Sequence, residues 1–416
     1  MTETVRVLTW GTAKEGPCAY FRGHLYDEAL RDLGVEMRHI SQVRFKPAEG
    51  WEDRDPVETV EAGQMELDTT DLDWADVILF RRYYNTSIKC ALPTSCGFLT
   101  QDPAEADKHP HGTKRQDDIT RAIWPAVRDG WTGGIVYETD DNHWQIKPWN
   151  GYYGDVINER DLIADMTRRA DLVTVAMPAL AEEYGRYNDN IRVIRNAIDP
   201  TLYVADAPRP EGDKPRLVYY GSTARLRDYA GFPTDRGKWE GGHARAAVDA
   251  HRRLLHRVFL GTNPGTEHVV GQLFDEQYNS IEGIAAFSRG LANLHGDIGI
   301  APLLGDDFDR CKSELHWLEY AMTDMAFIGQ RFRGEGPYQV VRDGVDGLLA
   351  RGAQEWHDAV RKLATSADLR ADLAGAAKER VLAEYDYRQR AVEWADAFRW
   401  AAEHPGYGAK HRLVAA

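Results

Sequence analysis

Long hydrophobic runs and surplus positive charge are both missing from this sequence. No stretch of the 416 residues approaches 18 consecutive apolar positions, so no membrane span is expected. The formal net charge of −15 and the isoelectric point near 5.4 argue against general binding to nucleic acid or to anionic membranes. A local basic groove stays compatible with that total.

Cysteine is also scarce, with four residues in the whole chain. No cysteine spacing matches a metal-ligand pattern, and few thiols without a pairing pattern are typical of a reducing compartment. The first ten residues, MTETVRVLTW, contain no signal-peptide core and lead directly into an apolar strand pattern. We therefore expect a cytoplasmic protein.

What the sequence does contain is a repeated alternation of apolar strands, glycine-containing turns and amphipathic helices. VRVLTW, at residues 5–10, predicts a buried strand, and a loop with Gly11 and Gly16 leads from it to one predicted helix that ends at Gly34. VEMRHI predicts the next strand. The same rhythm restarts at RLVYYGS, after the proline-rich residues 204–215. This pattern predicts two doubly wound α/β domains.

The predicted division of the chain follows from this pattern. It comprises a first Rossmann-like domain at residues 1–203, a linker at 204–215, a second Rossmann-like domain at 216–385, and a closing helix with a tail at 386–416. Residues 41–74 and 98–131 are polar and are predicted to be irregular, which is typical of functional loops and of disordered segments.

One predicted helix, DDFDRCKSELHWLEYAM at residues 306–322, carries charge within an apolar pattern. Lys312 and Glu319 lie seven residues apart, which would put them on nearly the same side of a single helix. The acids before them favour a helix start, whose N–H groups attract anions. Two interpretations stay open here: a solvated helix flank, or a site for a ligand with phosphate and hydroxyl groups.

Four segments, in order, resemble glycosyltransferase family 4 and its relatives. They are ADLVTVAMPALAEEYGRYNDNIRVIRNAIDPTLY, LVYYGSTARLRDY, LHGDIGIAPLLGDDFDRCKSELHWLEYAM and GEGPYQVVRDGVDGLLARGAQEWHDAVRKL. In the first half, GPCAYFR and VYETDDNHWQI are similar to a subgroup common in phage and capsule-type transferases. The resemblance implies the α/β fold called GT-B, with two Rossmann-like domains facing a central cleft and a C-terminal helix that crosses back to the first domain.

For the second domain, the resemblance implies a site for a nucleoside-diphosphate sugar, with UDP or GDP as the nucleotide. Glu319 would accept hydrogen bonds from the ribose hydroxyls, and Lys312 with Ser313 would contact the diphosphate. Where the family often has a second glutamate, this chain has Cys311. The other implied donor contacts are Gly11, Gly16, Gly221, Ser222, Arg225 and Arg227, and the two arginines would neutralise the leaving group.

For the first domain, the resemblance implies the acceptor side. Asp141 and His143, in ETDDNHW, are candidate catalytic residues together with Arg225 and Lys312, because such groups orient hydroxyls and stabilise developing charge. Asp140 and two further residues are candidate acceptor contacts. These two are Tyr20 and Arg22. For Arg22, a role in a structural ion pair is an equally good interpretation. Adjacent aspartates in a strand point to opposite faces, so no metal is expected.

The sequence thus predicts a retaining, metal-independent hexosyltransferase that needs no cofactor beyond its nucleotide-sugar co-substrate. The acceptor stays open between a modified base of phage DNA, a virion protein and a cell-envelope glycan, and so does the oligomeric state. Two other classes are also compatible with the pattern. One is a GT-B nucleotide-sugar epimerase or phosphorylase, and the other is a non-catalytic nucleotide-sugar-binding protein.

Overall fold

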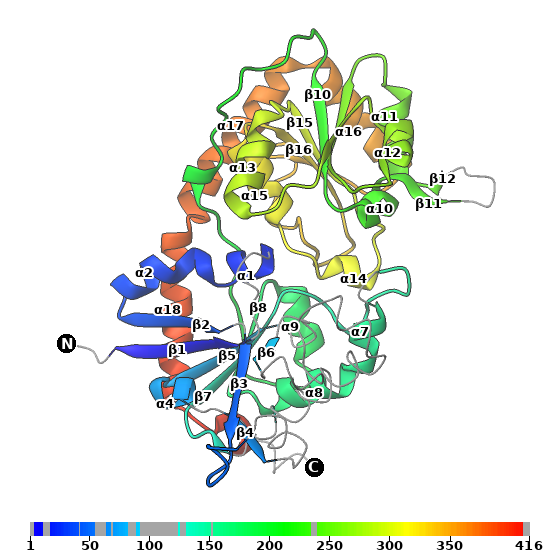
Figure 1. Cartoon of the computed structure of the whole chain (residues 1–416). Coiled ribbons are helices and arrows are strands. Elements are labelled where there is room, and N and C mark those ends of the chain that lie inside the picture. Colours follow the sequence, from blue (N-terminus) through cyan, green and yellow to red (C-terminus); the bar gives the residue numbers. More distant parts are fainter. Residues whose placement is uncertain are drawn as a thin grey trace.

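Two α/β domains, each built on a parallel six-stranded sheet, make up the protein (Figure 1). The computed structural model describes residues 4–10, 17–40, 42–54, 64–67, 70–81, 89–91, 124, 130–150, 153–233 and 239–410. Both domains have helices on both faces of their sheet, which is the fold class that the sequence predicts. None of the helices within the described residues has the length and apolar character needed to cross a membrane.

The first sheet has the strand order β2-β1-β5-β7-β8-β9. Its strands are β1 (Val5–Trp10), β2 (Val35–Ile40), β5 (Val77–Arg81), β7 (Gly134–Thr139), β8 (Leu172–Val175) and β9 (Ile191–Val193). Every residue of β5, β7 and β8 is buried, because helices cover both faces of the sheet. This burial explains why the sequences of these strands are mostly apolar. The helices of this domain include α4 (Thr70–Trp74), α7 (Tyr153–Asn158), α8 (Arg160–Arg169) and α9 (Pro178–Tyr184).

Two predictions for the first domain are wrong. The predicted single helix before Gly34 is broken into α1 (Pro17–Phe21), the 3-10 turn η1 (His24–Tyr26) and α2 (Asp27–Asp32). It breaks at Gly23, where the guanidinium of Arg81 packs so closely that a Cβ atom would come within 1.9 Å of it. Residues 41–74 are not wholly irregular either. They contribute β3 (Gln42–Pro47) and β4 (Met65–Leu67), which form a small sheet with β6 (Lys89–Ala91). Nearly all of 98–131 lies outside the described residues.

The second sheet has the strand order β14-β13-β10-β15-β16-β17. Its strands are β10 (Arg216–Tyr220), β13 (His256–Thr262), β14 (Glu276–Asn279), β15 (Ile298–Ala301), β16 (Ala326–Gln330) and β17 (Leu348–Ala350). A hairpin of β11 (Gly231–Pro233) and β12 (Trp239–Gly241) projects from this domain. The strand order reverses between β10 and β15, and ligands of such sheets bind beyond the carboxyl ends of the strands at that point.

The helices of the second domain lie on both sides of this sheet (Figure 1). They are η4 (Thr223–Arg225), α10 (Leu226–Ala230), α11 (His243–Ala250), α12 (Glu267–Leu273), α13 (Ile284–Asn293), α14 (Asp307–Arg310), α15 (Leu315–Met322), α16 (Ala353–Thr365) and α17 (Ala367–Glu384). Trp356 of α16 and Trp317 of α15 are fully buried, one in the core on each side of the sheet.

The predicted helix at 306–322 is in fact two helices, α14 and α15, and this prediction is wrong. Asp306 caps α14, since its carboxylate accepts hydrogen bonds from two backbone N–H groups of the first turn at 3.0 and 2.9 Å. The chain leaves the helix at Cys311 and starts a new one after Glu314. Lys312 therefore lies in the turn between the helices, and it does not share a helix face with Glu319.

The chain crosses between the domains twice, and the two crossings are bonded to each other. The first follows β9 through the 3-10 turn η3 (Pro200–Leu202), and the second joins α17 to α18 (Tyr387–Glu403). The N–H of Ile198 donates to the carbonyl of Tyr385 at 2.9 Å, and the N–H of Tyr387 donates to the carbonyl of Ile198 at 3.2 Å. Helix α18 then packs its apolar face on the core of the first domain, as Figure 1 shows, and the short α19 (Tyr407–Lys410) follows.

Candidate active site

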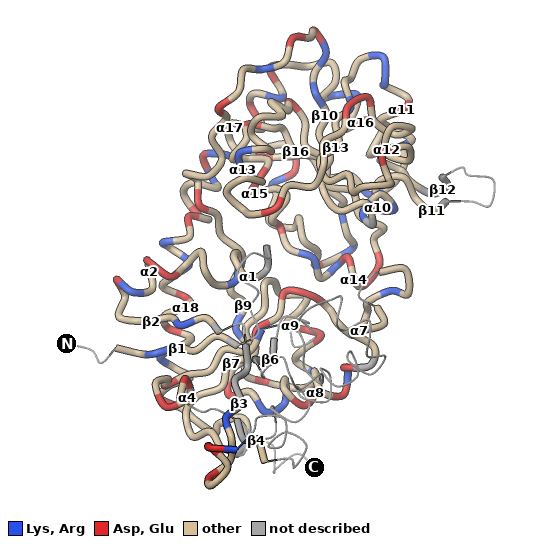
Figure 2. Tube along the Cα trace, in the orientation of Figure 1, with Lys and Arg blue, Asp and Glu red and all other residues tan. Residues whose placement is uncertain are grey.

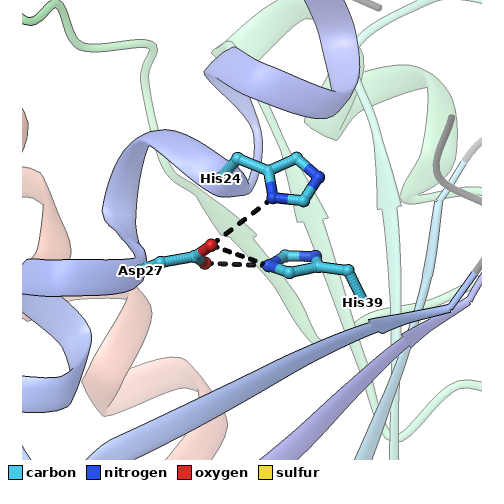
Figure 3. A group of neighbouring side chains, drawn as sticks. All are labelled: His24, Asp27 and His39. Atoms are coloured by element: carbon cyan, nitrogen blue, oxygen red, sulfur yellow. Dashed lines mark hydrogen bonds and ion pairs between the residues drawn. The ribbon is translucent and has the colours of Figure 1, made fainter. Parts of the chain in front are cut away.

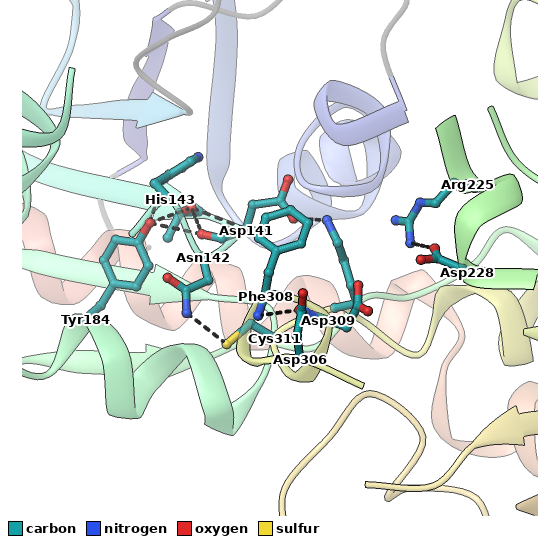
Figure 4. A network of polar contacts seen from close by, with 12 residues as sticks. Asp141, Asn142, His143, Tyr184, Arg225, Asp228, Asp306, Phe308, Asp309 and Cys311 are labelled. Atoms are coloured by element: carbon teal, nitrogen blue, oxygen red, sulfur yellow. Dashed lines mark hydrogen bonds and ion pairs between the residues drawn. The ribbon is translucent and has the colours of Figure 1, made fainter. Parts of the chain in front are cut away.

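A group of charged side chains lies at the carboxyl ends of β10 and β15, where the strand order reverses. We call it the polar cluster, and its members are Arg225, Asp228, Asp306, Asp309 and Lys312 (Figure 4). Nη1 of Arg225 lies 3.1 Å from Oδ2 of Asp228. The charges of Asp228 and Arg225 also act on Asp309, so the cluster joins the segment after β10 to the segment around α14. Both segments contact the first domain, through Arg227 and Lys312.

Burial and crowding raise the pKa of two carboxyls in the polar cluster, those of Asp309 and Asp228. The pKa of Asp309, which is 5% exposed, is raised to about 7 by burial and by the neighbouring carboxylates of Asp228 and Asp306. Burial also raises the pKa of Asp228, although Arg225 opposes it. Near neutral pH the cluster is thus less negative than its three carboxyls suggest, which makes an additional anion easier to accommodate.

Lys312 connects the polar cluster to the first domain. Its Nζ lies 2.5 Å from Oδ1 of Asp141, which follows β7 of the first domain, and both side chains are mostly buried. The ammonium also lies over the ring of Phe308, 4.0 Å from the centroid. Asp141 is thus the first-domain anion that Lys312 holds.

Other contacts tie α14 and the turn after it to the first domain. Arg310 pairs with Glu182 at 2.9 Å and with Glu183 at 3.3 Å, both on α9. Figure 2 shows charged residues of both signs around α14 and on the first-domain segments that face it. The segment around α14 is thus the part of the second domain that faces the first domain at the site.

Cys311 is packed into the same interface. Its Sγ accepts a hydrogen bond from Nδ2 of Asn142 at 3.4 Å (Figure 4). Burial raises the pKa of the thiol to about 11, so it is neutral at physiological pH. Cys311 is therefore a packing residue at this interface.

Glu319 sits on α15 beneath two tyrosines and is 2% exposed. The hydroxyl of Tyr203 donates to Oε1 at 3.1 Å, and the hydroxyl of Tyr220 donates to Oε2. Burial raises the pKa of Glu319 to about 7. A carboxylate has about four acceptor positions, so two remain for ligand hydroxyls once these tyrosines are counted. The contact between Glu319 and the ribose hydroxyls stays a prediction. Because Glu319 is buried, this contact requires the side chains that cover it to move.

The loop after β10 brings only one of its two predicted arginines into the polar cluster. Gly221 has φ 149°, and Gly261 of the neighbouring strand β13 packs so tightly on it that a Cβ there would lie 2.0 Å from the Gly221 carbonyl oxygen. Arg225 joins the cluster, whereas Arg227 donates across the interface to the carbonyl of Trp149 at 3.2 Å. Ser222 is exposed.

The first-domain candidates divide between the interface and the interior. Arg22 is 1% exposed, and it donates to Glu138 Oε1 at 2.7 Å and to the carbonyl of Ile194 at 2.6 Å. His143 is equally buried, and its Nδ1 lies 2.7 Å from the hydroxyl of Tyr184. Both side chains therefore lie in the interior of the first domain.

The remaining candidates are placed as follows. The charge of Asp140 acts on Arg22 and Glu138, whereas Asp141 pairs with Lys312, and both aspartates follow the end of β7. Tyr20 is half-buried, and burial together with the charge of Asp199 raises its pKa. Ser313 is half-buried in the turn beside Lys312. Gly11 and Gly16 lie outside the described residues.

A cavity of about 380 Å³ adjoins the polar cluster. Asp228 and Asp306 belong to its lining, which also includes Arg331, Arg333 and Arg351. The volume lies within the range of about 300–1,000 Å³ that is usual for small-molecule sites. A ligand bound at the cluster therefore has adjoining space with a basic lining.

Sequence reasoning missed the groups that hold these candidates in place. Glu314 is fully buried, and Arg195 of the first domain lies 3.5 Å from it. His316 stacks on Tyr220 with 4.3 Å between the ring centroids, and burial beside Arg225 lowers its pKa to about 3. No spacing signals these contacts, because the partners lie about 100 residues apart or belong to different domains.

Comparison with known proteins agrees with this architecture. Residues 262–396 match the family described as "Glycosyl transferase-like". The fold is similar to that of sucrose-phosphate synthase from Thermosynechococcus elongatus, with 13% identity, a TM-score of 0.59, and coverage of 95% of this chain and 98% of that one. None of the curated proteins matches the sequence.

Two further solved structures share the fold. One is the Anabaena protein HepE in complex with UDP and glucose, with 12% identity, a TM-score of 0.55, and coverage of 95% and 99%. The other is a glycosyltransferase from Rickettsia africae, with 11% identity, a TM-score of 0.54, and coverage of 96% and 99%. The fold is GT-B, and residues 262–396 form a glycosyl transferase-like region within it. Together they support a glycosyltransferase enzyme.

Proposed function

We propose that this protein transfers a hexose from a nucleoside-diphosphate sugar, with UDP as the first choice of nucleotide, to an acceptor hydroxyl. The observation that carries the proposal is the ion pair of Lys312 with Asp141 at the edge of the polar cluster. A half-buried arginine and an ammonium, which both act on Asp228 at the switch point of a doubly wound sheet, offer a diphosphate two cations. HepE, which shares the fold, has been solved with UDP-glucose and gives the choice of nucleotide.

The candidate residues on the donor side of the interface have the following roles in this proposal. Lys312 and Arg225 bind the diphosphate and stabilise the charge that develops on it as the sugar leaves. Ser313 and the loop at Gly221 add hydrogen bonds to the phosphates. Glu319 accepts hydrogen bonds from the ribose hydroxyls. The cavity beside Asp228 receives the part of the donor that extends beyond the cluster.

The reaction requires Asp141 to exchange partners. When the diphosphate binds Lys312, the Asp141 carboxylate is released toward the acceptor side, where it orients the acceptor hydroxyl. The bond between the anomeric carbon and the diphosphate oxygen breaks, the acceptor oxygen bonds to that carbon, and the hydroxyl proton passes to the leaving phosphate. This sequence needs no metal ion, because the protein's own cations neutralise the leaving group, and it corresponds to retention of configuration.

The experiment that tests the proposal is binding of UDP, GDP, ADP and dTDP, followed by thermal unfolding with and without Mg²⁺. A ligand at 100 times its Kd raises the free energy of unfolding by roughly 2.7 kcal/mol, which a melting curve resolves easily. We expect a shift with UDP that Mg²⁺ does not change. No shift with any of the four nucleotides would overturn the donor assignment.

Incubation with UDP-glucose then separates the classes of activity. Transfer yields UDP only when an acceptor hydroxyl is supplied, apart from slow hydrolysis. A changed sugar nucleotide without acceptor would identify an epimerase, and release of a sugar phosphate with added phosphate would identify a phosphorylase. Tight UDP-glucose binding with no turnover on DNA, protein or glycan acceptors would favour a binding protein.

A further inference from the structure

Three potential metal ligands converge in the first domain, away from the polar cluster. They are His24 of η1, Asp27 at the start of α2, and His39 near the end of β2, and Figure 3 shows their side chains pointing toward one another. Their nitrogen and oxygen ligand atoms all lie within 4.8 Å of one another. Of the residues that the structure describes, no other group of three such side chains meets in this way.

The distances suit a small transition-metal ion. Oδ2 of Asp27 lies 3.4 Å from Nδ1 of His24 and 3.0 Å from Nε2 of His39. Zinc bonds to imidazole nitrogen and carboxylate oxygen are about 2.0–2.2 Å long, and tetrahedral angles then separate the ligand atoms by about 3.3–3.5 Å. The two separations that involve Asp27 therefore lie within a few tenths of an ångström of the tetrahedral value, and all three ligand atoms lie within 4.8 Å of one another.

Thr9 contacts the ring nitrogen of His39 that faces away from Asp27, and a histidine ligand needs such a partner to fix its orientation. Its hydroxyl lies 2.7 Å from Nδ1 of His39 and 3.4 Å from the carbonyl oxygen of Arg38. Thr9 and His39 are also register partners on β1 and β2, so the sheet itself fixes this contact. A hydroxyl that accepts from Nδ1–H and donates to the carbonyl leaves the lone pair of Nε2 directed at Asp27, where a cation would bind.

The degree of burial fits a bound ion better than a solvated surface cluster. The side chains of His24, Asp27 and His39 are 20%, 31% and 15% exposed, so the three are accessible on one side only. The centroids of the two imidazole rings lie 3.8 Å apart, and Figure 3 shows the nitrogens that face Asp27 on the same side of its carboxylate. Three protein ligands leave one tetrahedral position for water or for a ligand oxygen.

We propose that His24, Asp27 and His39 form a binding site for a divalent transition-metal ion of the Zn²⁺ class. Two imidazoles and one carboxylate are the ligands that such ions prefer, whereas Mg²⁺ and Ca²⁺ prefer oxygen alone. The site joins η1 and α2 to the edge strand β2. It holds the carboxyl end of that strand in place within the first domain. This inference does not depend on the proposed transferase activity.

The test is metal binding by the full-length protein, stripped with EDTA and titrated with Zn²⁺ alone. We expect about one high-affinity Zn²⁺ per chain by calorimetry and elemental analysis, and a raised melting temperature. Co²⁺ in place of Zn²⁺ should give the visible absorption of a tetrahedral site. His39→Ala and the near-isosteric Asp27→Asn should each weaken Zn²⁺ binding by roughly 100-fold or more, because each removes a direct ligand. Thr9→Val should weaken it by about 10-fold.

Two controls separate this site from other histidines. His256→Ala removes a histidine that pairs with Glu276 at 2.8 Å, and it should leave Zn²⁺ binding unchanged. His109→Ala/His111→Ala removes two histidines that are close in sequence and lie outside the described residues. Melting curves in EDTA check that each variant folds. Absence of Zn²⁺ binding in the wild type, or binding that only the His109/His111 variant abolishes, would overturn the proposal.

Discussion

Lys312 of the second domain holds Asp141 of the first domain, with Nζ 2.5 Å from Oδ1. This ion pair connects the two halves of the predicted site, because the lysine belongs to the donor side and the aspartate to the acceptor side. In the proposed reaction the diphosphate displaces the carboxylate from Lys312. The first two predictions follow from that exchange.

Lys312→Met should weaken UDP binding. A hydrogen bond to a charged group contributes about 1.5–3 kcal/mol, so we expect Kd for UDP to rise by roughly 10- to 150-fold. Calorimetric titration measures this directly. Lys378→Met is the matched control, since Lys378 pairs with Asp324 at 2.9 Å on the outside of the second domain. Equal UDP affinity in wild type and Lys312→Met would contradict the assignment.

Asp141→Asn should have opposite effects on binding and on turnover. Because the carboxylate no longer competes for Lys312, we expect UDP to bind more tightly, by about 5-fold if the pair contributes near 1 kcal/mol. Once an acceptor is known, kcat should fall, since the amide orients the hydroxyl less well than the carboxylate. A loss of UDP affinity in this variant would show that Asp141 supports the donor site instead.

Glu319 should make the stability of the protein depend on pH between about 4.5 and 7. Burial raises its pKa from 4.5 to about 7, so the folded protein binds a proton in this window that the unfolded chain has released. The free energy of unfolding of the wild type should therefore fall, as pH rises through this window, by up to ~3 kcal/mol relative to Glu319→Gln. Urea unfolding at pH 4, 5.5 and 8 measures the difference between the two proteins. Parallel pH profiles would contradict a raised pKa.

Arg22→Met should destabilise the first domain strongly. Removal of one partner from a buried ion pair typically costs about 3–5 kcal/mol, and here it leaves Glu138 buried without its closest cation. Arg209→Met is the control, because its pair with Asp297 at 2.7 Å is half exposed and contributes about 0–1 kcal/mol. If Arg22→Met melts like the wild type but loses affinity for the acceptor, Arg22 is an acceptor contact, as the sequence resemblance implies.

The sequence alone determined the fold class. Continuous apolar strands such as VILFR at Val77–Arg81 occur where helices cover both faces of a sheet, and glycine turns separate them from amphipathic helices. The sequence likewise predicted the helix pair α16 and α17 and the crossing helix α18, because each segment has a long periodic pattern. These signals are local, so a single chain displays them without an alignment.

Only the tertiary structure decided how the candidate site is assembled. The break at Cys311 and Lys312 depends on contacts with Asn142 and Asp141, about 170 residues earlier in the chain. Periodicity carries no information about partners so distant, and it therefore predicted one continuous helix. The burial of Arg22 against Glu138 has the same origin.

The cluster of His24, Asp27 and His39 also depends on contacts that local sequence patterns do not predict. The spacing of these residues matches no short metal motif, and the sequence predicted no metal. Parallel pairing of β1 with β2 sets Thr9 beside His39, and the break of the helix at Gly23 sets His24 and Asp27 above them. The sequence supplies the chemical groups of this protein, but the packing of the domains decides which of them meet, because their contacts are made between segments far apart in the chain.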